Sequence, residues 1–381
     1  LSIQNSVYPY TQFLGISMKK SHLYVKYASK YIKKSIAIYQ SNKNINNRLV
    51  QSKTAFTNRS LRKNIEILAI ELLEYLKVNA NTDDISRPIY SLNLTNISGS
   101  TGISMVANSP FYLEGLSGII IFAKTAIIAG LPVDINWLNK LTDNYYETIS
   151  LFLQSKLIDL SGLYGVTGAI YPLLYRHNEL KSYNKHVSMT ALKNLKHGHN
   201  LASIINYEGI DRTSDDFLTG TCSNLILFSL LNRLSPNKLF AMNAETDYNR
   251  LLKAIKHTQD GQQFFDLKQN NDPMAGLAHG QSGAAIALSE YSKNLGLNSS
   301  ELSNINIALN FERDLIKHET NSWPNFSDIT RTYNLMGWCN GPAGIGLARL
   351  LLLQNHGYDN NTFEDVRYAI KCVINTTNKL D

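Results

Sequence analysis

The segment Gly276–Gly283, with the sequence GLAHGQSG, shows how the whole chain is organised, because its glycine spacing recurs along the sequence. The pattern G-x-x-[G/S] occurs five times, and the steps between the first glycines are 50, 55, 60 and 61 residues. Regular self-similarity at such a period is typical of repeat proteins. The five copies are Gly115–Gly118, Gly165–Gly168, Gly220–Ser223, Gly280–Gly283 and Gly341–Gly344.

An apolar run of helical length follows each glycine turn, and a more amphipathic run, such as PVDINWLNKLTDNYYETISLFLQS from Pro132, comes after it. The apolar run predicts a helix buried on all sides, and the amphipathic run predicts a helix with one face in water. Few stretches have the alternation of a long β-strand. The sequence therefore predicts an all-α fold, an α/α toroid made of a double ring of helical hairpins joined by G-x-x-G turns.

The composition indicates a globular protein, with 44% hydrophobic and 18% charged residues among 381. Three cysteines provide no disulfide framework, which favours a reducing, cytoplasmic compartment. The longest apolar stretch, from Gly118 to Val133, is interrupted by Lys124 and ends at a proline, so we expect a buried helix there and no integral membrane segment. Peripheral contact with a membrane remains open.

The net charge of +7 comes from the N-terminal flank. Residues 1–65 contain twelve Lys and Arg and no acid, which leaves 25 basic and 30 acidic residues in 66–381. Nucleic-acid binding, membrane binding and a transit peptide are open interpretations of the flank. We favour a solvated connector from a neighbouring module, with no nucleic-acid partner. The predicted organisation is a basic flank over 1–60 and a helical-repeat domain over 61–381, where a helix begins near Leu61.

The chemistry-bearing residues lie beside the glycine turns. If all inner helices begin at the same end of a ring, residues near the turns meet in space although they are about 60 positions apart. The sequence thus predicts that five residues are neighbours: Glu114, Asp216, Cys222, His279 and Cys339.

Each of these residues also has a simpler interpretation. Cys339 is either a small buried hydrophobe or a thiolate that serves as zinc ligand or nucleophile. His279 is either a core histidine bonded to a carbonyl or a general acid and base. Asp216 is either a helix cap or a partner in proton transfer. Cys372, on the apolar face of RYAIKCVI, is expected in the core.

Four segments resemble the lanthionine synthetase C-like cyclases: GLAHGQSGAAIAL, GWCNGPAGIGLARLL, YLEGLSGIIIF and SWPNF. The resemblance covers 61–381 and is greatest to the C-terminal cyclase module of type 2 lanthipeptide synthetases (LanM). The His-Gly and Trp-Cys-x-Gly turns, in this order, are its specific features. The resemblance implies an α/α toroid with a central zinc ion that closes lanthionine or methyllanthionine rings, by adding peptide cysteines to dehydroalanine or dehydrobutyrine.

The resemblance assigns roles residue by residue. It makes Cys339 a zinc ligand, His279 and Asp216 catalytic residues, and Trp338 and Asn340 candidates for substrate binding. It implies a further adjacent Cys-His ligand pair near position 396, so we expect a truncated domain that alone binds zinc poorly. It also implies a ribosomal precursor peptide as partner and allows a dehydratase module before residue 1.

Three departures from the family pattern are present. Asn340 stands where the type 2 enzymes usually have histidine, Pro342-Ala343 is transposed, and Gly220–Ser223 lacks its second glycine. Two other functions stay open: a non-catalytic helical-repeat module that binds peptides, and another α/α-toroid enzyme such as a glycosidase. The glycosidase would use two carboxylates from Asp215, Asp216 and Glu114.

Overall fold

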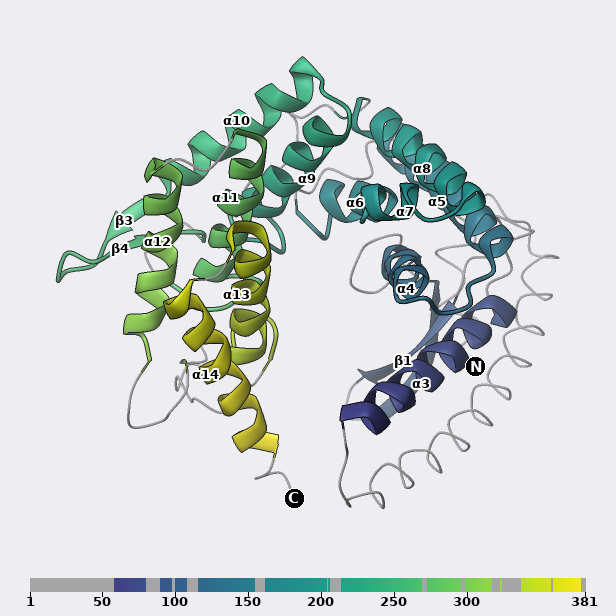
Figure 1. Ribbon diagram of the computed structural model, residues 1–381, viewed down its shortest axis with the longest axis horizontal. Coiled ribbons are helices and arrows are strands. Elements are labelled where there is room, and N and C mark those ends of the chain that lie inside the picture. Colours follow the sequence, from purple (N-terminus) through teal and green to yellow (C-terminus); the bar gives the residue numbers. More distant parts are fainter. Residues whose placement is uncertain are drawn as a thin grey trace. The chain divides into compact units, whose positions relative to one another are not determined.

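The computed structural model describes residues 58–79, 90–97, 100–107, 116–154, 162–203, 205, 214–268, 273–295, 299–316, 323, 337–357 and 359–377 (Figure 1). The predicted basic flank lies outside these residues as far as position 57. Contacts divide the chain into two compact units, one of residues 1–109 with 129–133 and one of residues 110–128 with 134–381. The predicted boundary at residue 60 stays a prediction.

Among the described residues, the first unit consists of a helix and a β-hairpin. Helix α3, Asn58–Asn79, confirms the helix expected from Leu61. Strands β1, Tyr90–Ile97, and β2, Ser100–Ala107, pair antiparallel. Their register pairs Leu92 with Met105 and Leu94 with Ile103. This hairpin was not expected, because Ser, Thr and Asn between those apolar residues weaken the strand signal.

The second unit is built from helical hairpins. The inner helices are α4 (Leu116–Ile128), α6 (Val166–Leu174), α9 (Thr221–Leu234), α11 (Gln281–Leu295) and α13 (Pro342–His356). The outer helices are α5 (Ile135–Gln154), α8 (Lys185–Ser203), α10 (Lys238–Lys253), α12 (Ser299–Asp314) and α14 (Asn360–Thr377). The short helix α7 (His177–Lys181) precedes α8, and strands β3 (Ile255–His257) and β4 (Gln263–Phe265) precede α11. Every inner helix begins one residue after the first glycine of its repeat.

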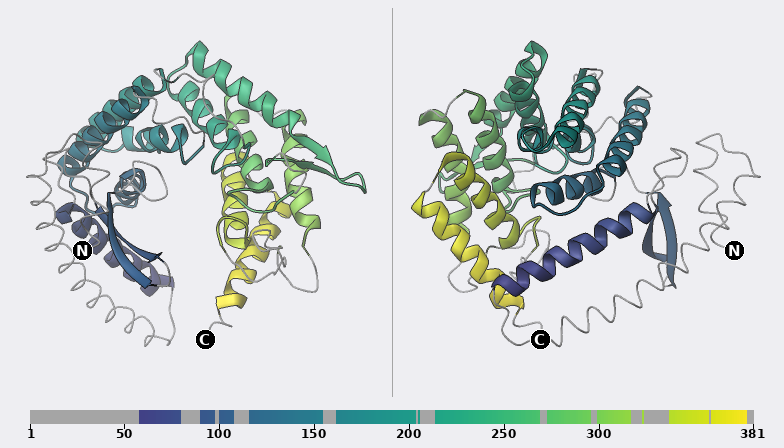
Figure 2. Two further views of the ribbon diagram at one scale, coloured as in Figure 1. Left: turned by 180° about the vertical axis from the view of Figure 1, so that it is seen from behind. Right: turned by 45° about the vertical axis from the view of Figure 1, so that its right-hand side comes forward.

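The order of the hairpins follows the sequence. The inner helices contact one another in the order α4, α6, α9, α11 and α13, and outer helices pack on the inner helices of their own repeats. Figure 1 shows this succession by label, and Figure 2 shows it by colour from teal to yellow. Helix α9 has buried residues around its circumference, whereas α5 has a solvent-facing side. The predicted all-α, α/α-toroid fold class is confirmed for these hairpins.

The second glycine of a turn is required by close packing. A Cβ atom on Gly344 would lie 1.8 Å from the carbonyl oxygen of Trp338. In the third repeat a serine occupies the equivalent position: Ser223 is buried, and its hydroxyl donates to the carbonyl of Gly220 at 3.3 Å. The serine that replaces the second glycine in this copy is thus accommodated in the first turn of α9.

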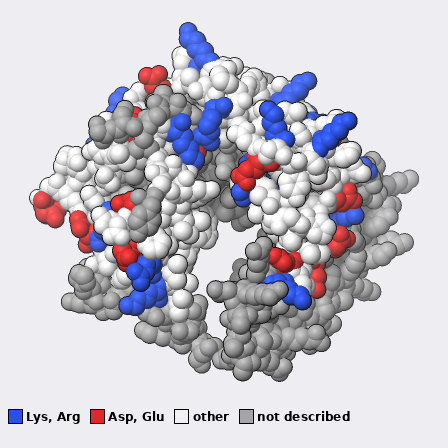
Figure 3. Space-filling model, in the orientation of Figure 1, with Lys and Arg blue, Asp and Glu red and all other residues white. Residues whose placement is uncertain are grey.

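Two observations concern a membrane: the hydropathy of the described helices and the charges on one face of the molecule. Over the part of the chain that the structure describes, no helix combines the length and the hydropathy needed to cross a bilayer. On the face drawn in Figure 3, Lys and Arg lie among Asp and Glu and do not form one continuous field.

One buried cation joins the first two hairpins. Lys124 of α4 is 1% exposed, and its Nζ donates to the carbonyls of Pro172 at 2.7 Å and Leu173 at 2.8 Å. These carbonyls belong to the last turn of α6. The last carbonyls of a helix have no N–H partner within the helix, so the amine of Lys124 takes that place. Burial lowers the pKa of Lys124 from 10.5 to about 7. The side chain therefore caps the C-terminal end of α6. Because its pKa differs between the folded and unfolded states, the free energy of unfolding depends on pH.

We predict that folding stability contributed by Lys124 rises with pH. Between pH 7 and 10.5 the unfolded chain holds a proton at this amine that the folded protein lacks, so raising the pH favours folding. The gain between pH 7 and 9 is roughly 2 kcal/mol, discounting other groups. Urea unfolding at pH 7 and pH 9 gives the change in the free energy of unfolding for the unmodified protein and for Lys124→Met. The difference between these two changes is the contribution of Lys124. Equal pH dependence in the two proteins would contradict the assignment.

Candidate functional site

Backbone hydrogen bonds link successive glycine turns. The N–H of Leu163 donates to the carbonyl of Leu218 at 2.8 Å, and the N–H of Leu218 donates to the carbonyl of Ala278 at 3.1 Å. The N–H of Ala278 donates to the carbonyl of Cys339 at 2.9 Å. All four residues stand two positions before the first glycine of their repeats. We call this series the turn ladder. It confirms that turns two to five converge; in the first turn, Gly115 and the residues just before it lie outside the described residues.

The ladder brings His279 and Asp216 together. Nδ1 of His279 lies 2.6 Å from Oδ2 of Asp216, although the residues are 63 positions apart. The side chain of Asp216 is 2% exposed and that of His279 is 23% exposed. Because an ionised carboxylate only accepts hydrogen bonds, Nδ1 carries the proton and Nε2 keeps its lone pair. The imidazole is thus oriented, and its Nε2 has no hydrogen-bond partner among the described residues.

The other oxygen of Asp216 holds its own turn. Oδ1 accepts from the backbone N–H of Thr219 at 2.7 Å and from its hydroxyl at 3.0 Å. The N-cap of α9 is Gly220, so Asp216 shapes the turn before the helix and does not cap it. Burial raises the pKa of Asp216, but hydrogen bonds and charge from His279, together with the bonds from Thr219, outweigh it and hold the pKa below its usual value. The pair therefore favours an ionised carboxylate.

Asp215 anchors the same turn from outside. Its Oδ1 accepts from Nε of Arg250 on α10 at 2.5 Å and from the hydroxyl of Thr221 at 2.5 Å. The side chain is 5% exposed. The carboxylates considered for a glycosidase therefore have other partners: Asp215 binds an arginine and Asp216 binds an imidazole. Glu114 lies outside the described residues.

Cys339 lies in the fifth turn, next to the fourth. It is partly buried against Leu163, Leu218 and Ala278. Burial raises the pKa of its thiol. Gly276 permits this approach: its φ is 106°, and a Cβ there would lie 2.4 Å from the carbonyl oxygen of Cys339.

The neighbours of Cys339 differ in exposure. Trp338 is 38% exposed and presents a large aromatic surface. Asn340 is half-buried, and its Oδ1 has no hydrogen-bond partner among the described residues. Both candidates for substrate binding thus flank the thiol in the same turn.

The other two cysteines are packed in the interior. Cys222 has no exposed surface, and burial followed by the negative charges of Asp216 and Asp215 raises its pKa well above the usual value. It lies near Asp216 as expected, but as a neutral thiol inside α9. Cys372 is 4% exposed, which confirms the core position predicted for it.

The donor set for a metal ion is incomplete within the described residues. Cys339 is partly exposed and near the His279 turn, and a cysteine sulfur is a preferred zinc donor. No group of three His, Cys, Asp or Glu side chains with metal-binding geometry occurs in the described parts of the chain. The residues present therefore fit one zinc ligand, and further donors would have to come from outside the described residues.

Sequence reasoning missed the charged residues that hold the fourth turn. Glu312 of α12 and Arg349 of α13 both have 0% side-chain exposure and form an ion pair at 2.8 Å. Glu312 also accepts hydrogen bonds from both sides of the His279 turn. The signal was present, since Arg349 is the one charged side chain in the apolar run IGLARLLLL.

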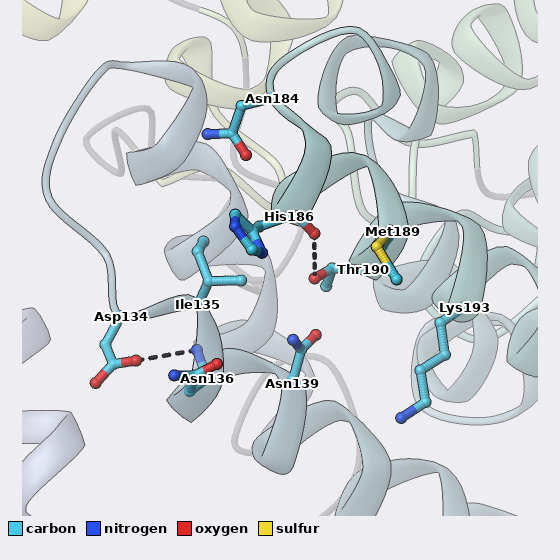
Figure 4. Close-up of a pocket in the computed structure, with 9 residues that line it drawn as sticks. All are labelled: Asp134, Ile135, Asn136, Asn139, Asn184, His186, Met189, Thr190 and Lys193. Atoms are coloured by element: carbon cyan, nitrogen blue, oxygen red, sulfur yellow. Dashed lines mark hydrogen bonds between the residues drawn. The ribbon is translucent and has the colours of Figure 1, made fainter.

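A cavity of 580 Å³ lies elsewhere, between α5 and α8. It is lined at the helix starts by Asp134, Asn136 and Asn184, and farther along by His186 and Lys193 (Figure 4). Asp134 and Asn184 already accept from the first free N–H groups of the two helices. None of the predicted site residues lines this cavity.

We predict that the three thiols differ sharply in their reactivity. Cys339 is partly exposed, whereas Cys222 and Cys372 are buried, so a maleimide should label only Cys339 in the folded protein. Its rate should keep rising above pH 9, because burial raises the thiol pKa. Mass spectrometry of digested protein locates the label, and labelling in urea should give all three. Native labelling of Cys222 at a comparable rate would contradict the placement.

Comparisons with known proteins give a family and several distant structural similarities. The model of the family described as lanthionine synthetase C-like protein matches residues 107–381. A comparison with curated proteins gives no match. The solved structure of nisin cyclase is 17% identical, with 83% of this chain and 76% of that chain covered and a TM-score of 0.48.

Two carbohydrate-active enzymes give similar scores. A glycoside hydrolase of family 105 from C. acetobutylicum ATCC 824 is 13% identical, with 70% of this chain and 78% of that chain covered and a TM-score of 0.41. The unsaturated glucuronyl hydrolase of Bacillus sp. GL1 is 10% identical, with 81% of each chain covered and a TM-score of 0.44. No argument about activity rests on these three structures. The family match, which spans most of the chain and includes all the turns of the ladder, shows that the chain belongs to the lanthionine synthetase C-like family.

Proposed function

We propose that the chain is a lanthipeptide cyclase that closes thioether rings in a dehydrated precursor peptide. The single observation that carries the proposal is the bond of 2.6 Å between His279 and Asp216, formed beside the Cys339 turn. Membership of the lanthionine synthetase C-like family supports the reaction type. As part of the same proposal, the chain is the cyclase module of a type 2 synthetase, which also has a dehydratase module, and not a free-standing enzyme.

The reaction adds a peptide thiol across a carbon–carbon double bond. The bond from sulfur to Cβ of the dehydro residue forms, the thiol gives up its proton, and Cα gains one. The intermediate between these steps is an enolate, which needs electrostatic stabilisation and a proton donor. His279 has the required groups, because its Nε2 is free to accept the thiol proton and then to return a proton to Cα. An imidazole can act both as a base and as an acid in such a proton transfer.

Asp216 serves the imidazole. With Oδ2 it accepts from Nδ1–H, which fixes the ring and the tautomer, and it stabilises the imidazolium that forms on protonation. With Oδ1 it holds the turn through Thr219. Loss of the carboxylate should therefore lower the rate through orientation as well as charge.

Cys339 would be the protein ligand of a zinc ion at this site. When bound, zinc lowers the pKa of a coordinated thiol and holds its sulfur in place. Trp338, exposed beside this ligand, offers an aromatic surface for the peptide, and Asn340 offers an amide oxygen without a partner in the described residues.

The alternative of a non-catalytic peptide-binding module predicts no role for the His279–Asp216 bond. A glycosidase would need two carboxylates across a cleft. The engagement of Asp215 with Arg250 and of Asp216 with His279 favours neither function.

We predict that His279→Ala slows ring closure strongly without loss of the fold. General acid–base catalysis contributes about 10²- to 10⁴-fold, so the rate should fall by that amount. The assay uses a dehydrated peptide with one cysteine. Cyclisation leaves the mass unchanged, so free thiols are counted by alkylation and mass spectrometry. Asp216→Asn should lower the rate by a smaller factor.

His257→Ala is the matched control, because this histidine is exposed on strand β3 and is not one of the residues of the turn ladder. Its rate should equal that of the unmodified chain. Zinc content, measured in a chain that also carries the expected Cys-His ligand pair, should fall for Cys339→Ala and not for His279→Ala. A cyclase rate that is unaffected by His279→Ala would refute the proposed role.

A further inference from the structure

A single carboxylate holds the turn that carries His279 at both ends. Oε1 of Glu312 accepts from the N–H of Gly276 at 2.8 Å and from the N–H of Ser282 at 3.0 Å. These residues stand three positions before and three positions after His279. One oxygen atom therefore fixes both ends of the segment whose centre presents the imidazole.

The second oxygen of Glu312 is fixed in turn. Oε2 accepts from the hydroxyl of Ser282 at 2.6 Å and from Arg349 at 2.8 Å. Arg349 also donates to the hydroxyl of Ser282 at 3.1 Å and to Asp365 of α14 at 3.0 Å. Glu312 and Arg349 have no exposed side-chain surface, so the carboxylate cannot exchange these partners for water.

The same contact reaches the fifth turn. Gly276, which Glu312 holds, is the residue whose Cα packs on the carbonyl of Cys339. Ala278, within the held segment, donates to that carbonyl. A displacement of the segment would therefore change the position of His279 relative to both Asp216 and Cys339.

We propose that Glu312 is a positioning residue that sets the place and tautomer of the His279 imidazole. The interpretation of the ring-closure rate rests on the proposed function, whereas the spectroscopic test of the His279 tautomer does not depend on it. Neither oxygen of Glu312 contacts the imidazole, and its effect passes through the backbone of Gly276 and Ser282. Its partner Arg349 orients the carboxylate and balances its charge.

Two substitutions separate position from charge. Glu312→Asp keeps the charge opposite Arg349 but is one methylene shorter, so its oxygen cannot span both N–H groups. Glu312→Gln keeps the length and an acceptor oxygen for both N–H groups but loses the charge. A positioning role predicts that Gln preserves the site better than Asp; a role in charge balance alone predicts the reverse order.

The first readout is the tautomer of His279, measured by the ¹⁵N chemical shifts of its ring in the folded chain without peptide or metal. The unmodified protein and Glu312→Gln should show the Nδ1–H tautomer, whereas Glu312→Asp should show a mixture with the Nε2–H form. The second readout is ring closure, in which Glu312→Asp should lower kcat about 10- to 100-fold with little change in KM.

Asp365→Asn is the control within the same network. It removes a different partner of Arg349 and leaves every contact of Glu312 with the turn in place. Its tautomer and kcat should match the unmodified chain even if urea unfolding shows it to be less stable. If Glu312→Gln does not fold, the comparison of Glu312→Asp with Asp365→Asn decides alone.

The proposal is overturned if Glu312→Asp folds with the tautomer and kcat of the unmodified chain, or if Asp365→Asn changes them equally. Absence of ring closure in a chain that carries the complete ligand set and bound zinc would refute the proposed function, while the tautomer comparison would still test the role of Glu312.

Discussion

The structure of the second unit depends on the backbone hydrogen bonds of the turn ladder. Each bond joins residues at the same position of successive repeats, from Leu163 to Leu218, Ala278 and Cys339. A buried backbone N–H or carbonyl needs a partner, so the turns cannot shift past one another without breaking these bonds. The ladder therefore fixes the inner helices at a common level. It also turns a sequence separation of about 60 residues into contact between His279 and Asp216.

Buried charges hold the two turns that carry the imidazole and its carboxylate. Arg250 binds Asp215 in the third turn, and Glu312 binds the backbone of the fourth. The second turn is held by a neutral side chain, since Oδ1 of Asn224 accepts from the N–H of Gly162 and from the hydroxyl of Thr167. Burying an ionic group costs free energy unless its partners are complete. We interpret these contacts as the means by which α10 and α12 give rigid positions to turns that must present reactive side chains.

Much of this could be predicted from the sequence because the glycine turns have a clear physical signal. Their period indicated that an inner helix follows each glycine turn, and the convergence argument placed His279 beside Asp216. Cys222 was placed near the site, but its complete burial could not be read from a turn motif. The β1–β2 hairpin has too many polar residues for a confident strand pattern. Glu312 was missed because its partners are backbone groups in another repeat, and sequence periodicity does not show which face of an outer helix meets a turn.

Amide hydrogen exchange at Leu218 and Ala278 tests the central claim most directly. Both amides lie in turns before a helix, where exchange is ordinarily fast, yet the ladder gives both of them buried acceptors. The account predicts protection similar to that of amides in the middle of α9 and α11, lost only when the unit unfolds. Exchange of these two amides at the rate of an open loop, while the helices stay protected, would contradict it.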